Sequence, residues 1–180
     1  METLDRRFRI CLIGPQSTGK TELARRLAAH FGAVSIPEFA REYAIANPRE
    51  LTVDDVEPIA RGQMNGEDRA AEVGGATLVI RDTDLISTVV YARHYYGACT
   101  DWIERAARTR SADLYLLMDV DTPWTDDPVR DSADKRQELF VRFQVALQEF
   151  GVPFQIIRGD WNERTRAARA AIDNFLSSRA

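Results

Sequence analysis

Residues 14–21 of this 180-residue chain read Gly14-Pro15-Gln16-Ser17-Thr18-Gly19-Lys20-Thr21. They follow an apolar run, Phe8–Ile13, and precede a helical pattern that opens at Glu22. This spacing and context match the pattern G-x-x-x-x-G-K-[ST]. The two glycines allow the backbone to curl so that successive N–H groups face one anion, and the N-terminus of the next helix adds partial positive charge. The segment therefore predicts a loop that binds the phosphates of a nucleoside triphosphate.

Lys20 and Thr21 end this loop with the two side chains that phosphate chemistry needs. We expect Lys20 to reach the β- and γ-phosphates of ATP and the Thr21 hydroxyl to ligate Mg²⁺. Lysine is rare in the chain, because among 24 basic residues only Lys20 and Lys135 are lysine. A compact ammonium thus stands where the loop requires one. The alternative is a glycine-rich turn that only joins a strand to a helix.

The composition limits the other classes of function. A length of 180 residues predicts one domain, residues 1–180, and a net charge of −4 argues mildly against a nucleic-acid partner. No apolar run approaches 18 residues, so we expect no membrane association and a soluble, cytoplasmic protein. Cys11 and Cys99 are isolated and predict no metal cluster. Nothing in the composition indicates an oligomeric state.

The hydrophobic pattern alternates between short apolar runs and helical periodicity. This alternation predicts an α/β fold with a five-stranded parallel sheet flanked by helices. The expected strands are Phe8–Ile13, Ala33–Ile36, Thr77–Asp82, Leu114–Met118 and Phe154–Ile157. The expected helices are Lys20–His30, a long helix toward Glu72 that opens with a capping box at Thr52 and Asp55, Leu85–Tyr95, Lys135–Phe150 and Glu163–Leu176.

Residues 119–134 interrupt this rhythm with six aspartates, two prolines and one arginine, Arg130. We expect this segment to be a lid that closes over ATP and brings Arg130, and with it Arg136, to the transferring phosphate. The alternative is an ordinary solvated loop.

Carboxylates follow two of the expected strands. Because ligands of such sheets bind at the carboxyl ends of the strands, these carboxylates are candidates for chemistry. We expect Asp82 to hold Mg²⁺ beside Thr21, unless Asp82 or Thr83 only caps the next helix. Asp84 is expected to face the acceptor. Glu38 is a candidate proton acceptor with Arg41 on its helical face, and the alternative is an ordinary Glu–Arg helix pair.

Taken together, four segments resemble the ribosylnicotinamide kinase domain of NadR-type proteins. They are G-P-Q-S-T-G-K-T, E-F-A-R-E-Y at 38–43, D-T-D at 82–84 followed by Tyr91, Tyr95 and Gly97, and P-W-T-D-D-P-V-R at 123–130. The resemblance covers nearly the whole chain. It implies a P-loop kinase that phosphorylates the 5′-hydroxyl of nicotinamide riboside with MgATP and yields nicotinamide mononucleotide and ADP.

The resemblance also implies roles for single residues. Glu38, Arg41, Asp84 and Tyr95 would line the riboside site, with Tyr95 stacked on the pyridinium ring. Pro37 stands in this site where related chains often carry tryptophan. The resemblance places Trp124 and Arg130 in the lid. It places Gly159, Asp160 and Trp161 where the adenine would be held.

Two other functions remain open at this point. One is a kinase for another nucleoside or small metabolite. The other is a regulatory ATPase or nucleotide switch without a small acceptor, although the N-K-x-D, D-x-x-G and L-S-G-G-Q signatures of such proteins are missing. No H-x-G-H pattern is present either, so we do not expect this chain alone to transfer adenylyl groups.

Overall fold

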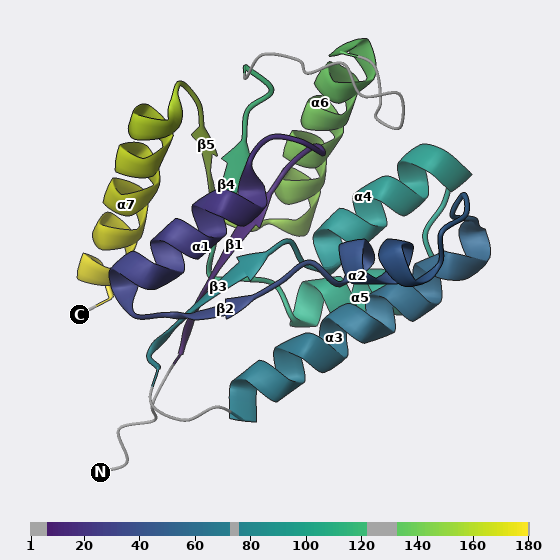
Figure 1. The fold of residues 1–180 in the computed structure, drawn as a ribbon, viewed down its shortest axis with the longest axis horizontal. Coiled ribbons are helices and arrows are strands. Elements are labelled where there is room, and N and C mark those ends of the chain that lie inside the picture. The colour runs from purple at the N-terminus through teal and green to yellow at the C-terminus, as the bar shows by residue number, and fades with distance from the viewer. Residues whose placement is uncertain (1–6, 73–75, 122–132, 180) are drawn as a thin grey trace.

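A computed structural model describes residues 7–72, 76–121 and 133–179, with the side chains of 133 and 134 left out. It contains one parallel sheet with the strand order β2-β3-β1-β4-β5, so the predicted α/β architecture is confirmed (Figure 1). The strands are β1 Phe8–Ile13, β2 Val34–Ile36, β3 Leu78–Asp82, β4 Leu114–Met118 and β5 Phe154–Ile157. Each lies within one residue of the predicted bounds.

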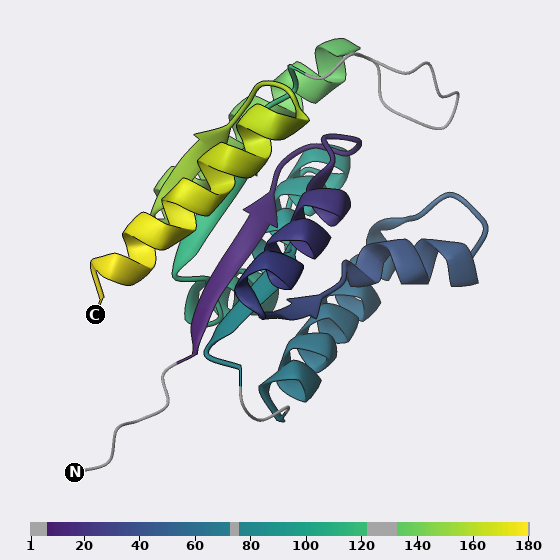
Figure 2. The ribbon, with the colours of Figure 1, turned by 60° about the vertical axis from the view of Figure 1, so that its left-hand side comes forward.

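Helices cover both faces of the sheet. The helices are α1 Lys20–Phe31, α2 Phe39–Ala46, α3 Val56–Glu72, α4 Leu85–Tyr96, α5 Asp101–Thr109, α6 Ala133–Phe150 and α7 Trp161–Ser177, with a 3₁₀ turn η1 Val53–Asp55 before α3. α1 and α7 pack on one face, and α3, α4, α5 and α6 on the other (Figures 1 and 2). The expected helices include neither α5 nor α2, although the spacing of Glu38 and Arg41 indicated a helical turn where α2 begins. Among the helices of the described residues, none has the length and apolar character of a membrane span.

The central strand shows how the sequence sorts residues between the two faces. Ile10 and Leu12 pack into the core under α1 and α7, whereas Cys11 and Ile13 pack into the core on the opposite side. All four side chains are fully buried. Successive side chains of a strand point to opposite faces, so a strand buried on both sides appears in the sequence as a continuous apolar run.

The parallel strands end at one edge of the sheet, and this edge positions the candidate site. The loop of residues 14–19 follows β1, Glu38 follows β2 and Asp84 follows β3. The Thr83 N–H donates to the Leu12 carbonyl at 3.0 Å and the Asp119 N–H to the Ile157 carbonyl at 2.9 Å, so the loops continue the register of the strands. The predicted site residues therefore converge because the strands are parallel.

Helix α2 is held on α3 through a glycine. An added Cβ at Gly62 would lie 2.0 Å from the Phe39 ring, so the ring occupies the space above this residue. The neighbouring Gln63 is buried, and its amide accepts from the Phe39 N–H at 3.1 Å. Its Nε2 donates to the Thr83 carbonyl at 3.4 Å. Gln63 thereby links the start of α2 to the end of β3.

A second clamp joins the other end of α2 to the start of α3. The buried carboxylate of Asp55 accepts two hydrogen bonds from the Arg49 guanidinium, at 2.7 and 2.8 Å, and one from the Tyr43 hydroxyl at 2.8 Å. It also accepts from the Thr52 N–H at 2.7 Å, which confirms the predicted capping box. Hydrogen bonding by Arg49, Thr52 and Tyr43 holds the pKa of Asp55 well below its ordinary value.

We expect Gly62→Ala to lower the free energy of unfolding by about 1–3 kcal/mol, because its Cβ would overlap the Phe39 ring. Gly66→Ala is the matched control one turn along α3. A Cβ there would meet only Ile36, at 4.0 Å, and helix propensity should stabilise the protein by about 0.5–1 kcal/mol. Urea denaturation measures both. Equal effects of the two substitutions would contradict the packing of α2 on Gly62.

We expect Asp55→Asn to lower the Tm by several degrees at neutral pH. A folded-state pKa below the unfolded value means that the ionised carboxylate stabilises the fold above about pH 3.8, and that this stabilisation fades as the pH falls below it. The Tm difference from the unmodified protein should therefore narrow in acid. Asp54→Asn, an exposed neighbour, is the control and should show little difference at either pH. A difference independent of pH would contradict the clamp.

Candidate active site

The loop after β1 has no room for side chains at its two glycines. Gly14 has φ 137° and Gly19 has φ 83°, values that L-residues with a Cβ rarely adopt. A Cβ at Gly14 would lie 2.9 Å from the Met118 carbonyl oxygen, and one at Gly19 would lie 2.7 Å from the Trp161 ring. The loop thus passes in close contact with the end of β4 and the start of α7. This is the curled backbone that the sequence pattern predicts.

Lys20 lies buried in the curl of this loop. Its Nζ donates to the carbonyls of Gly14 at 3.0 Å and Pro15 at 2.7 Å. Burial lowers the pKa of Lys20, and the carboxylates of Glu38 and Asp82 act in the opposite direction. The ammonium is therefore placed between the phosphate loop and two carboxylates.

Thr21 and Asp82 form the polar pair expected of a magnesium site. The Thr21 hydroxyl donates to Asp82 Oδ2 at 2.5 Å. Asp82 Oδ1 is buried, and no donor among the described residues reaches it. A hydroxyl and a carboxylate are oxygen ligands of the kind that Mg²⁺ takes together with phosphate and water, so the residues fit the ion. No group of three or more histidine, cysteine or acidic side chains in the described parts of the chain would hold a metal by itself.

Asp84, and neither Asp82 nor Thr83, caps the helix that follows β3. Asp84 Oδ1 accepts from the Ile86 N–H at 2.9 Å, and Oδ2 accepts from the Tyr115 hydroxyl at 2.5 Å. Burial raises the pKa of Asp84, while these hydrogen bonds act against the rise. Both carboxylate oxygens thus already have donors within the fold.

A cavity of about 500 Å³ extends from the phosphate loop to α4. It begins at Gln16 and ends among Tyr91, Tyr95 and Tyr96. The rings of Tyr91 and Tyr95 lie parallel, with an interplanar angle of 4° and centroids 6.1 Å apart. The acidic side chains that line the cavity are Glu38, Glu50, Asp55 and Asp84, and the described residues that line it include no lysine or arginine. The cavity is thus aromatic at one end and acidic along its length.

Glu38 joins this cavity to the phosphate loop. It occupies the N-cap position of α2, two residues after the last residue of β2, and lines the cavity. Burial raises the pKa of Glu38, as does the negative charge of Asp82, whereas Lys20 lowers it. A carboxylate with a raised pKa close to a phosphate-binding lysine is suited to accept a proton from an acceptor hydroxyl.

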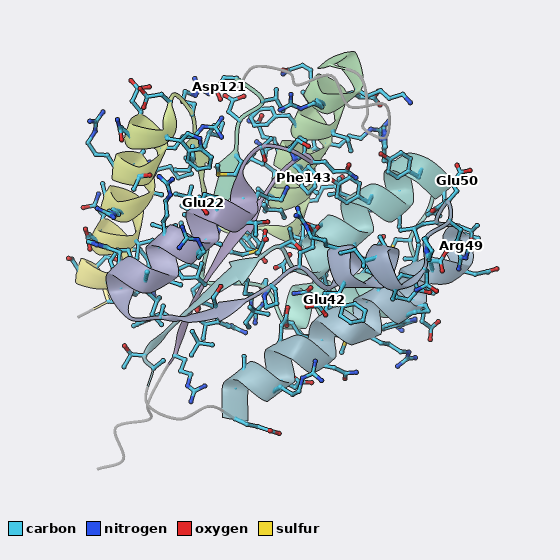
Figure 3. All side chains as sticks on the ribbon, in the orientation of Figure 1. Glu22, Glu42, Arg49, Glu50, Asp121 and Phe143 are labelled. Carbon is cyan, nitrogen blue, oxygen red and sulfur yellow. The ribbon has the colours of Figure 1, made fainter. Side chains whose placement is uncertain are left out.

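The loop after α2 forms a wall of the cavity that the sequence analysis missed. Glu50, Leu51 and Thr52 line it, and the Tyr96 hydroxyl donates to the Leu51 carbonyl at 3.0 Å. Figure 3 shows the side chains of Arg49 and Glu50 at the right-hand side of the molecule, whereas α7 lies at the left. Only the capping box signalled this wall in the sequence.

The structure brings together most, but not all, of the predicted site residues. Arg41 is exposed and does not line the cavity, and Pro37 lines a separate groove formed with α2 and α3. Arg136 is buried in the first turn of α6. Residues 122–132 of the predicted lid, with Trp124 and Arg130, lie outside the described residues.

The segment after β5 lies against the phosphate loop, as the adenine cradle would. Gly159 has φ 94°, and Asp160 caps α7 by accepting from the N–H groups of Asn162 and Glu163 at 2.8 and 2.9 Å. The Trp161 ring packs on Gly19 and is 40% exposed, so one part of it faces solvent.

Comparisons with known proteins agree with this geometry. The profile of the AAA domain family matches residues 9–164. The trifunctional NAD biosynthesis/regulator protein NadR of Escherichia coli (strain K12) is 27% identical over 165 residues, which are 86% of this chain and 39% of NadR. The chain thus spans about two fifths of the length of this relative.

Solved structures show the same likeness. A NadR protein in complex with NR superimposes with a TM-score of 0.78 and 26% identity, and one in complex with NAD and AMP-PNP with 0.82 and 27%. These matches cover 94% and 95% of this chain and 50% of each NadR chain. Deoxyadenosine kinase from M. mycoides with bound dATP has a TM-score of 0.64 at 10% identity, over 92% of this chain and 99% of that one, which shows the fold alone. The chain therefore belongs to the AAA domain family, as a P-loop protein homologous to NadR.

Proposed function

We propose that this chain transfers the γ-phosphoryl group of ATP to the 5′-hydroxyl of nicotinamide riboside and releases nicotinamide mononucleotide and ADP. The class of reaction, an ATP-dependent kinase, follows from homology to NadR and the shared fold of nucleoside kinases. The acceptor is the proposal. The observation that carries it is the cavity that starts at the phosphate loop, bears carboxylates along its length and ends in tyrosines.

The charge of the cavity favours a cationic aromatic acceptor. Nicotinamide riboside carries a pyridinium ring, which is attracted by tyrosine faces and by carboxylates. Tyr95 is 45% exposed and lines the cavity, with the ring of Tyr91 parallel to its own and the rings of His94 and Tyr96 beside it, so an acceptor in the cavity would meet this aromatic group. The ribose would then lie between the tyrosines and the phosphate loop, with its 5′-hydroxyl toward Glu38. The NadR structure solved with NR supports this assignment.

The residues of the site divide the chemistry between them. Glu38 takes the proton of the 5′-hydroxyl. The hydroxyl oxygen then bonds to the γ-phosphorus as the bond between the γ-phosphorus and the oxygen that bridges it to the β-phosphorus breaks, which releases ADP. Lys20 binds the phosphate oxygens and offsets their charge. Thr21 and Asp82 would hold Mg²⁺, which neutralises charge on the phosphates when bound. Asp84 positions α4, which carries the tyrosines.

A regulatory ATPase without a small acceptor accounts less well for the structure. Such a protein has no need of a cavity of about 500 Å³ that adjoins the phosphate loop. A regulatory ATPase would bind ATP without turning over any acceptor.

The acceptor is tested by ADP release with MgATP against nicotinamide riboside, nicotinic acid riboside, uridine, cytidine, adenosine and thymidine. We expect kcat/KM for nicotinamide riboside to exceed the others by about tenfold or more, because the neutral nucleosides lack the ring charge. Nicotinic acid riboside adds a carboxylate that the acidic cavity disfavours. A higher kcat/KM for another nucleoside would reassign the acceptor. ATP binding without turnover of any of them would favour the regulatory ATPase.

We expect Glu38→Gln to lower kcat by about 10²–10⁴-fold with little change in the KM for the riboside, because it removes the proton acceptor. Since burial raises the pKa of Glu38 in the free enzyme, the acid limb of the pH profile of kcat/KM should lie above the ordinary value of 4.5 and vanish in the variant. Tyr95→Ala is the comparison and should raise the riboside KM while keeping the kcat. A Glu38→Gln enzyme that changes only KM would make Asp84 the stronger candidate for the base.

A further inference from the structure

Arg164 is a fully buried arginine on α7 for which the sequence analysis proposed no role. Its side chain is 1% exposed. Nη1 donates to the Thr18 carbonyl at 2.7 Å and Nε to the Gly159 carbonyl at 2.8 Å. Nη2 donates to the Asp119 carbonyl at 3.1 Å and to the Asp121 carboxylate. One guanidinium thus joins the loops that follow β1, β4 and β5.

The contact with Thr18 fixes a peptide of the phosphate loop. In a trans peptide the C=O and the following N–H point in opposite directions, and no cis peptide occurs in the described residues. When Arg164 holds the Thr18 carbonyl on one side, the Gly19 N–H is directed to the other. Successive N–H groups of such a loop bind the phosphate oxygens. The orientation of this donor therefore depends on Arg164.

The contacts with Gly159 and Asp121 fix the segment after β5 in the same way. Arg164 binds the Gly159 carbonyl, and the Asp121 carboxylate accepts from the Gly159 N–H at 2.5 Å. Asp121 is itself paired with Arg164. Both peptide groups of Gly159 are therefore held by this pair. The adjacent Trp161 ring packs on Gly19, which brings the segment back to the phosphate loop.

We propose that Arg164 is a positioning residue for the nucleotide, which holds the phosphate loop and the segment at residues 159–161 in one register so that triphosphate and base bind together. The inference rests on the proposed assignment of residues 159–161 to the adenine. Arginine is needed because its planar group offers five N–H donors in a fixed fork, whereas a lysine ammonium offers three from a single point. Arg164 touches only the protein and acts through the loops.

The test is calorimetric titration of the purified chain with MgATP and, separately, with inorganic triphosphate and Mg²⁺, in the absence of any acceptor. We expect Arg164→Lys to weaken ATP binding by about tenfold or more, and to weaken triphosphate binding less, because the link to the base segment is lost. Arg166→Ala, an exposed arginine two residues along α7, is the matched control and should bind both ligands normally. The riboside plays no part, so an error in the acceptor assignment leaves this result unaffected.

Two outcomes would overturn the proposal. ATP affinity within about twofold of the unmodified protein, in an Arg164→Lys chain with an unchanged circular dichroism spectrum, would make Arg164 a residue of stability alone. Equal losses of ATP and triphosphate affinity would show that the two loops are not linked through it. If the lysine variant does not fold, Asp121→Asn serves instead. It keeps the guanidinium but weakens the hold on Gly159, and it should reduce ATP affinity while sparing triphosphate.

Discussion

The loop after β1 packs so closely against its neighbours at two positions that neither position has space for a Cβ. At Gly14 the close neighbour is the Met118 carbonyl, and at Gly19 it is the Trp161 ring. This constraint sets the curl of the backbone, and the curl sets where Lys20 and Thr21 begin α1. It also ties the phosphate loop to the end of β4 and the start of α7, so the sheet and the site form one packed unit.

Charge is sorted between two halves of the site. The phosphate loop contains Lys20, which in the proposed function meets the anionic phosphates, and the cavity beside it is lined by carboxylates and tyrosines, which would meet a cationic acceptor. Glu38 lies at the boundary, where Lys20 lowers its pKa but burial and Asp82 raise it. In the proposed mechanism, this opposition would allow the Glu38 carboxyl group to act as a base beside the phosphates of ATP.

The strands and most helices could be predicted because each is encoded by its own residues. α5 was missed although Trp102, Ile103, Ala106 and Ala107 follow the period of an amphipathic helix, because its nine residues are fewer than the window over which a helical period is judged. The capping box at Thr52 is local and was found, whereas the contact of Asp55 with Tyr43 depends on tertiary packing. Arg164 could not be recognised, because most of its partners are backbone carbonyls, one of them 146 residues away, and carbonyls leave no pattern in a sequence.

Helix α2 has no buried residue, yet it carries Glu38 at its N-cap. Its attachment consists of the Phe39 ring over Gly62, the Gln63 amide and the Asp55 carboxylate. In the proposed mechanism, moving Glu38 away from the phosphates therefore requires the loss of these few contacts, whereas the apolar packing of the sheet against the other helices stays intact. In the proposed mechanism, opening the cavity therefore breaks the contacts between α2 and α3 and not the apolar packing of the sheet, so substitutions at this contact should change product release together with stability.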